Sequence, residues 1–152
     1  MKVRGFEIAK GWEDMGINLP KRSTKNAAAY DIEAAEDTIV PIYKPGVKPT
    51  LISTGLKGYC QEDECFFLLN RSGGPKKGFL TPHGFGLIDA DYYGNPNNDG
   101  HLLVQVFNCS DHELHVKKGD VIAQVLFTKF LITDDDNATG QRKGGFGSTD
   151  KK

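Results

Sequence analysis

The sequence lacks an apolar run long enough to cross a bilayer, and it lacks the start of a secretory signal. Its longest uninterrupted apolar run is Cys65-Phe66-Phe67-Leu68-Leu69, far below the roughly 20 residues that span a membrane. The first residues, MKVRGFEIAKGWED, contain neither an apolar h-region nor a small-residue cleavage site. We therefore predict no membrane span and no secretion, and we expect a cytoplasmic protein.

Cysteine is scarce, and charge of one sign is not in excess. The 3 cysteines, Cys60, Cys65 and Cys109, show no Cys-x-x-Cys spacing, which favours reduced thiols over a disulfide framework or a zinc site. We interpret His112 and His115 as part of a polar turn rather than as metal ligands. The net charge is -1, and no Lys/Arg cluster is long enough to neutralise a duplex backbone. A nucleic-acid polymer is therefore not an expected partner.

A long apolar period of 3.6 residues is also lacking, whereas 18 glycines and 7 prolines are dispersed along the chain. Between them lie runs rich in β-branched and aromatic residues, at residues 38–43, 48–53, 64–69, 86–90, 102–108 and 121–130. Such runs are typical of strands, and those that are apolar on both faces are typical of strands buried between two sheets. Residues 31–37 are too short for an isolated helix, so we expect them to be extended or a single turn. The 152 residues, 38% of them hydrophobic, suffice for one all-β core, a sandwich or barrel.

Two polar segments differ from this pattern. The run NPNNDG from Asn95 to Gly100 is dense in turn-forming residues between two apolar runs, and it predicts a protruding hairpin tip. Residues 133–152 contain almost no large apolar side chain except Phe146. This tail is either a solvated extension or a segment that folds over a ligand, since glycines, Arg142 and Lys143 beside Phe146 suit a phosphate and a flat ring. The residues alone leave both interpretations open.

Two segments in the first half of the chain contain candidate ligand-binding residues. Asp31 follows small residues in Ala28-Ala29-Tyr30-Asp31-Ile32. The later run Arg71-Ser72-Gly73-Gly74 combines a guanidinium, a hydroxyl and free backbone amides in one tight turn. Such a turn suits a phosphate, although an ordinary polar turn has the same composition. It is not a P-loop, because the Gly-x-x-x-x-Gly-Lys-Ser/Thr spacing is absent.

Two later segments contain candidate catalytic groups. In GLIDADYYG, residues 86–94, alternation places Asp89 and Asp91 on one face of a strand and Tyr92 on the other, unless the chain bends. Two such acids usually form a solvated face, but the flanking Leu87 and Ile88 can desolvate a carboxylate and make it a useful base. Gln124 is the one polar side chain within the apolar residues 121–127, so its amide bonds either to the core backbone or to a ligand or water.

These four segments and the tail resemble, in order and separation, the five motifs of the trimeric deoxyuridine triphosphatase (dUTPase) family. The matching runs, spread over residues 28–149, are AYD, RSG, GLIDADYYG, GD-x-IAQ and GGFGST. Gln141 stands where the family's tail usually has arginine, and Arg142 follows one residue later. Val121 follows the acid of the fourth motif, where Arg or Lys is common, and Asn70 stands where Pro often precedes the arginine. Many relatives lack the insertion from Asn95 to Gly100.

The resemblance implies a jelly-roll-like β-sandwich or barrel that forms a homotrimer with three sites at subunit interfaces. It implies hydrolysis of dUTP to dUMP and pyrophosphate with Mg²⁺. Residues 1–132 would form the catalytic domain, and residues 133–152 a flexible tail that closes over the site of a neighbouring subunit.

The resemblance also implies a role for each matching residue. Asp89 would be the general base, and Gln124 would orient the attacking water or an α-phosphate oxygen. Tyr92 would pack against the deoxyribose where a 2'-hydroxyl would otherwise lie. The remaining implied contacts are Arg71, Ser72 and Gly73 to the β and γ phosphates, Asp31 to Mg²⁺ through water, residues 83–88 (including His83, Leu87 and Ile88) to uracil, and Arg142, Phe146 and Gly147 in the closing tail.

Two alternatives remain open at this point. A dCTP deaminase resembles the same fold, although GLIDADY and GGFGST match the hydrolase better. A nucleotide-binding protein without catalysis could instead use the tip from Asn95 to Gly100 to contact a protein partner.

Overall fold

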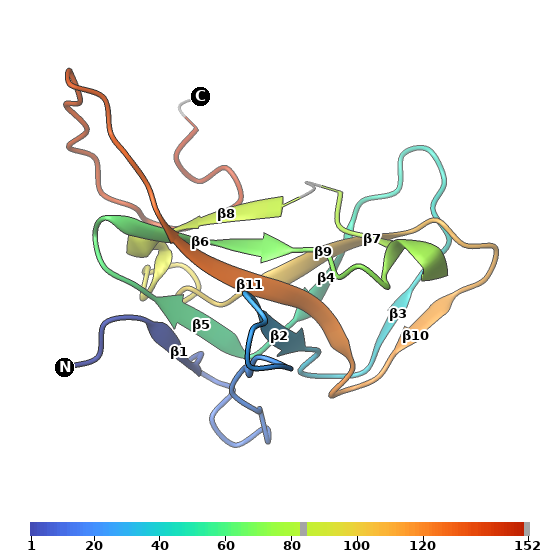
Figure 1. The fold of residues 1–152 in the computed structure, drawn as a ribbon. Coiled ribbons are helices and arrows are strands. Elements are labelled where there is room, and N and C mark those ends of the chain that lie inside the picture. Colours follow the sequence, from blue (N-terminus) through green and yellow to red (C-terminus); the bar gives the residue numbers. More distant parts are fainter. Residues whose placement is uncertain (83–84, 151–152) are drawn as a thin grey trace.

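In the part of the chain that the structure describes, the regular elements are short strands and two 3-10 helices (Figure 1). The computed structural model describes residues 1–82 and 85–150, and within these ranges there is no α-helix. In chain order the elements are β1 (Gly5–Ile8), β2 (Tyr30–Glu33), β3 (Thr38–Val40), β4 (Thr50–Ser53), β5 (Leu56–Tyr59), β6 (Glu64–Leu69), η1 (Pro75–Lys77), β7 (Phe79–Leu80), β8 (Phe85–Asp89), η2 (Ala90–Tyr92), β9 (Leu103–Asn108), β10 (Leu114–Val116) and β11 (Val121–Lys129). The all-β prediction is confirmed. A helix that could span a membrane is not found in the described ranges.

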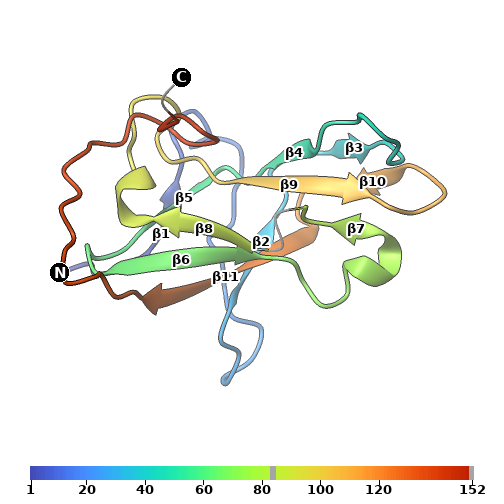
Figure 2. The ribbon, with the colours of Figure 1, turned by 90° about the horizontal axis from the view of Figure 1, so that it is seen from above.

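Two antiparallel sheets enclose the core. One has the strand order β2-β11-β6-β8 and the other β4-β9-β7, while β1 pairs with β5 and β3 with β10. Figure 2 shows the first sheet and the second as separate layers. Buried side chains from both layers form one cluster, including Phe66, Leu68 and Val125 from the first sheet and Ile52, Val104 and Val106 from the second. This packing fixes the direction of β6, β8 and β11, and several of the predicted site residues lie on or just after these strands.

The predicted strands are largely correct, but several are shorter than expected. β3 ends at Val40 and β4 begins at Thr50, because Pro41 and Pro49 have no backbone N–H to donate to a sheet. The expected turn around His112 is present. The expectation that His115 belongs to the same turn is wrong, since His115 lies in β10 opposite Ile39.

Strands β1, β5, β7 and β10 are not predicted by the sequence patterns. In β5 the reason is Gly58, because a glycine inside a strand usually weakens it. A Cβ at Gly58 would lie 2.5 Å from Cζ of Phe66. The glycine therefore makes room for the ring of a core residue, a requirement that appears only after β5 and β6 have packed.

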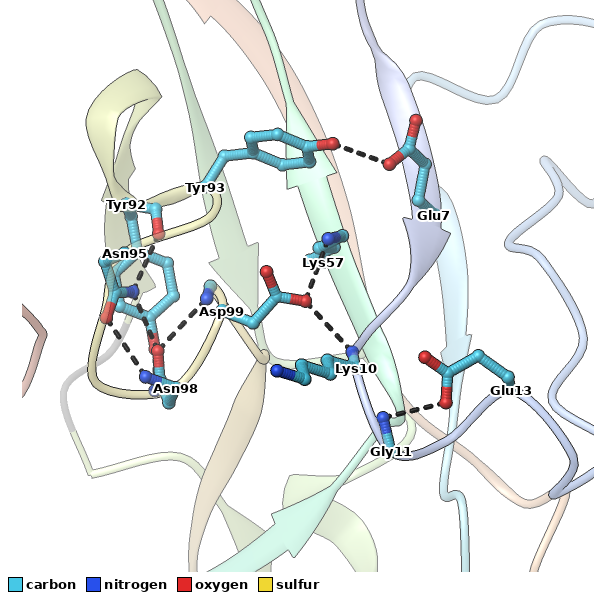
Figure 3. A network of polar contacts seen from close by, with 11 residues as sticks. Glu7, Lys10, Gly11, Glu13, Lys57, Tyr92, Tyr93, Asn95, Asn98 and Asp99 are labelled. Carbon is cyan, nitrogen blue, oxygen red and sulfur yellow. Dashed lines mark hydrogen bonds and ion pairs between the residues drawn. The ribbon is translucent and has the colours of Figure 1, made fainter.

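The predicted protruding tip from Asn95 to Gly100 is wrong. We refer to these residues as the 95–100 loop. The loop folds back against β5 and the residues just after β1 (Figure 3). Asn95 is only 5% exposed. Asp99 Oδ2 accepts hydrogen bonds from Lys10 N–H at 2.9 Å and from Lys57 Nζ at 2.8 Å. Asp99 also has a φ of 61°, a conformation that Asp tolerates better than most residues. Composition predicted the turn but not these distant partners.

We predict that the free energy of unfolding falls as the pH drops from 7 through about 6.5, the ordinary histidine pKa. Burial lowers the pKa of His101, and its Nε2 accepts a hydrogen bond from Gly55 N–H at 3.0 Å. The unfolded chain therefore binds a proton that the folded chain resists, which destabilises the fold by at most about 1.4 kcal/mol per pH unit. Urea unfolding of wild type and His101→Phe between pH 5 and 8 measures this, and equal slopes in both proteins would contradict it.

Candidate functional site

An open pocket of about 300 Å³ lies beside β8 and is covered in part by the tail. Its lining includes six residues that the sequence singled out: Leu87, Ile88, Asp89, Tyr92, Arg142 and Phe146. Apolar side chains and backbone surround a few charged groups, the composition of a small-molecule site. We call this cavity the β8 pocket. The structure thus brings the third predicted motif and the tail together.

Tyr92 reaches the β8 pocket because the chain bends. The predicted strand through residues 86–90 ends one residue earlier, at Asp89, and η2 follows. Tyr92 therefore does not alternate with Asp91 across a strand, which corrects the sequence-based expectation; its side chain packs with the core and is 8% exposed. Burial raises its pKa, so the hydroxyl stays neutral at physiological pH.

Two kinds of contact hold the tail across the β8 pocket: ion pairs made by Arg142 and close packing at Gly145. Arg142 Nη2 donates to Asp89 Oδ2 at 2.5 Å, and Arg142 Nε donates to Asp91 Oδ1 at 2.6 Å. The hydrogen bond to Asp91 is the main cause of a raised Arg142 pKa. Gly145 lies against Tyr92, since a Cβ there would be 2.7 Å from Tyr92 Cε2. A larger residue at position 145 would hold the tail away from the ring.

Phe146 lies at the rim of the same pocket. Its side chain is 59% exposed, and its backbone adopts a φ of 53°, followed by Gly147 at 87°. The left-handed conformation at Gly147 costs a glycine little. These two residues turn the end of the tail, so that an aromatic ring is present at the pocket without joining the core.

A second group of predicted residues lies at the other end of the β2-β11-β6-β8 sheet. Gln124, in the central strand β11, is opposite both Asp31 and Leu69. Its Nε2 donates to the carbonyl of Asn70 at 3.1 Å. Arg71, two residues after the end of β6, has its Nε 3.7 Å from Asp31 Oδ1. We call Asp31, Arg71 and Gln124 the β6-end cluster.

Glycine and hydroxyl groups extend the β6-end cluster toward solvent. Arg71, Gly73 and Gly74 line a second open cavity of about 410 Å³. Ser72 is exposed next to them. The guanidinium, the hydroxyl and the glycine backbone therefore lie in one accessible turn, as a phosphate-binding site requires.

The β8 pocket and the β6-end cluster do not meet within one chain. Asp89 is opposite Cys65 near the start of β6, whereas Gln124 is opposite Leu69 at its end. These register positions are four residues apart, which is about 13 Å along a strand. One water molecule cannot contact both Asp89 and Gln124 in this arrangement.

Several residues of the site are not predicted from the sequence. Gln105 of β9 lines the β8 pocket. It is the single polar residue in an apolar run, and this feature could have indicated it. Asn98 bonds to the Tyr92 hydroxyl, which no local pattern indicates. Asn70 Oδ1 is buried and has no hydrogen-bond partner within the described residues. His83, predicted near the uracil, lies outside those residues.

The carboxylate of Asp31 suits a divalent cation that is bound mainly by substrate phosphates. Among the described residues, no group of three or more His, Cys, Asp or Glu side chains is close enough to hold a metal. Asp31, beside the guanidinium of Arg71, is the carboxylate of the β6-end cluster. Mg²⁺ retains several waters and is commonly bound by one or two carboxylates together with substrate phosphates. Asp31 fits such an outer position.

Known proteins match this chain over nearly its whole length. The family model described as dUTPase matches residues 16–150. The deoxyuridine 5'-triphosphate nucleotidohydrolase of Lactococcus lactis subsp. lactis is 45% identical over 152 residues, covering 98% of this chain and 99% of the relative. The corresponding protein of Enterobacter sp. is 35% identical and covers 88% of each chain. A dUTPase crystal structure from Streptococcus mutans superposes with a TM-score of 0.79 at 38% identity, covering 86% of this chain and 98% of that one.

We predict that Arg142→Ala releases the tail, whereas Gln141→Ala does not. Arg142 has a side chain only 20% exposed and bonds to two carboxylates, while the neighbouring Gln141 is exposed. Chymotryptic cleavage after Phe146, followed by mass spectrometry, should become about two- to fivefold faster, because partly exposed ion pairs contribute at most about 1 kcal/mol. Equal cleavage rates in Arg142→Ala and wild type would show that these ion pairs do not hold the tail.

Proposed function

Because the chain belongs to the dUTPase family and is a dUTP nucleotidohydrolase, we propose that it cleaves dUTP to dUMP and pyrophosphate at a site shared between subunits of a homotrimer. Water attacks the α-phosphorus, and pyrophosphate leaves. The observation that supports the shared site is the separation of the β8 pocket from the β6-end cluster. A subunit interface that places the pocket of one chain against the cluster of another supplies both to one substrate.

In this proposal the β8 pocket binds the nucleoside. Backbone groups of Leu87 and Ile88 face the uracil edge, and the Tyr92 ring packs against the deoxyribose. Phe146, with Gly147 behind it, covers the base when the tail closes. The pocket's apolar lining supports this role, because a flat ring gains from burial against aromatic and aliphatic side chains.

Asp89 is the proposed general base. Its side chain is 50% exposed, so a water molecule can reach it. The water oxygen forms a bond to the α-phosphorus, its proton passes to Asp89, and the bond from the α-phosphorus to the bridging oxygen breaks with the electron pair going to pyrophosphate. Arg142 must leave Asp89 before this step, because its Nη2 bonds to the Oδ2 oxygen that would take the water proton.

The β6-end cluster supplies the other half of the site. Gln124 orients the attacking water or an α-phosphate oxygen through its half-buried amide. Arg71, Ser72 and the backbone of Gly73 hold the β and γ phosphates, where donors stabilise the charge that pyrophosphate acquires. Mg²⁺, bound by phosphate oxygens and water, would neutralise part of the triphosphate charge. Asp31 would hold that ion through its waters.

The tail has a proposed role in the trimer, and the cysteines bear on the cellular compartment of the protein. We propose that residues 133–152 close over a site of a neighbouring subunit in the trimer, using the same glycine and aromatic contacts that they make here with the β8 pocket. Cys60, Cys65 and Cys109 are all free thiols, which supports a reducing, cytoplasmic location.

Pyrophosphate release measured across dUTP, dCTP, dTTP and UTP tests the proposed reaction. We expect release from dUTP far above that from the other nucleotides. Mass analysis of the product in ¹⁸O-water adds the position of attack, since label in dUMP indicates the α-phosphorus. Ammonia release from dCTP, or label only in pyrophosphate, would overturn the proposal.

We predict that Asp89→Asn lowers turnover by a factor on the order of 100 or more, because the amide cannot accept the water proton. dUTP binding should remain, since Asn has nearly the same size as Asp and the other residues that line the pocket are unchanged. Stopped-flow turnover and calorimetric binding measure the two effects separately. Near-normal turnover in Asp89→Asn would remove Asp89 from the role of base.

A further inference from the structure

The 95–100 loop forms a hydrogen-bonded network that ends on the hydroxyl of Tyr92. Asn98 Nδ2 donates to Tyr92 Oη at 2.8 Å, and Asn98 Oδ1 accepts from Asn95 Nδ2 at 2.7 Å. Asn95 Nδ2 also donates to the Tyr92 carbonyl at 2.8 Å. Figure 3 shows Asn95 and Asn98 beside the Tyr92 ring. The loop thus contacts both the backbone and the side chain of this residue.

Backbone groups fix the direction of every hydrogen bond in this network. Asn98 Oδ1 accepts from Gly100 N–H at 3.1 Å, so its Nδ2 is the end that meets Tyr92. Asn95 Oδ1 likewise accepts from the N–H groups of Asn97 and Asn98, which leaves Asn95 Nδ2 as a donor. A backbone N–H can only donate, so neither amide can be turned round without losing bonds.

The Tyr92 hydroxyl is therefore used within the protein. It accepts from Asn98 and donates to the carbonyl of His101 at 2.9 Å. These two bonds hold the hydroxyl end of the side chain and restrict movement of the ring. The hydroxyl has no proton left to donate to a nucleotide, so Tyr92 acts on a ligand through the shape of its ring.

The outer end of the loop is anchored to the body of the protein. Asp99 bonds to Lys10 N–H and to Lys57 Nζ, with side chains that are only 15% exposed at Lys57 and 26% at Asp99. Lys57 also lies over the ring of Tyr93, 4.8 Å from its centroid. A loop held at this end by Lys10 and Lys57 gives Asn98 a fixed position from which to hold Tyr92.

We propose that Asn98 is a positioning residue that sets sugar specificity by holding the Tyr92 ring in place. This inference rests on the proposed role of Tyr92 as the wall that excludes a 2'-hydroxyl. A ring held at both its base and its hydroxyl cannot move aside for the extra oxygen, whereas a ring held only by packing can. The inserted loop thereby sharpens discrimination between dUTP and UTP.

The test is the ratio of kcat/KM for dUTP to that for UTP in Asn98→Ala, Tyr92→Phe and the double variant. Asn98→Ala should lower the ratio by about fivefold, since one lost hydrogen bond is worth about 1 kcal/mol. Tyr92→Phe loses the bonds to both Asn98 and His101 and should lower the ratio by at least as much. The change should lie mainly in a rise of kcat/KM for UTP. The double variant should differ from Tyr92→Phe by less than about twofold, because both changes remove the same contact.

Asn108→Ala is the matched control for a general loss of stability. Asn108 is a buried asparagine that donates to the carbonyls of Val40 and His112, away from the β8 pocket. Asn98→Ala and Asn108→Ala should both lower Tm, but only the first should lower the ratio. Asn98→Asp keeps the acceptor that Gly100 requires and loses the donor to Tyr92. The hydroxyl can then bond to position 98 only by giving up its bond to His101, so the ratio should also fall while the loop stays folded.

Three results would overturn the inference. These are an unchanged ratio in both Asn98 variants, an equal fall in Asn108→Ala, and multiplied effects in the double variant. Tyr92→Ala separates this failure from failure of the proposed role of Tyr92. If Tyr92→Ala lowers the ratio and the Asn98 variants do not, only the positioning by Asn98 is wrong. If Tyr92→Ala leaves the ratio unchanged, the role of Tyr92 itself is wrong.

Discussion

The antiparallel register of β6 with its two neighbours is the constraint on which the account of function depends. β6 places Asp89 opposite Cys65 on one side and Gln124 opposite Leu69 on the other. Packing of Phe66 and Leu68 in the core prevents a shift of this register, because a slip by one residue would turn these side chains to the opposite face. Asp89 and Gln124, the proposed base and the proposed water-orienting amide, are thus held apart by the same packing that stabilises the fold. A shared site is the arrangement that uses both.

Tyr92 joins the β8 pocket to three other parts of the chain. Its backbone lies in η2, where the bend after β8 turns the ring toward the pocket. Its hydroxyl bonds to Asn98 and His101, and Gly145 of the tail lies against its ring edge. Pocket shape, loop anchoring and tail closure therefore all depend on the placement of one aromatic ring.

The sequence was sufficient to predict the fold class and most of the long strands, and it singled out residues that the structure gathers in the β8 pocket and the β6-end cluster. It predicted them because alternation, glycine and proline act locally, and because the five motifs are contiguous. It could not predict that the 95–100 loop folds inward, since Lys10 and Lys57, which hold Asp99, are distant in the chain. Nor could it show that Arg142 contacts Asp89 and Asp91, a contact across more than fifty residues. Strand β5 was missed because it contains Gly58, and the need for a glycine there arises only from its close packing against the ring of Phe66.

Subunit complementation tests the shared site most directly. Asp89→Asn and Arg71→Ala each remove one half of every site in a homotrimer, so each protein alone should be nearly inactive. Co-expression with two different tags gives mixed trimers, which native mass spectrometry can verify. If Asp89 and Arg71 of different chains serve the same substrate, random mixing at equal amounts should restore about a quarter of the wild-type dUTP turnover. Mixed trimers no more active than either parent would show that both residues act within a single chain and would contradict the account.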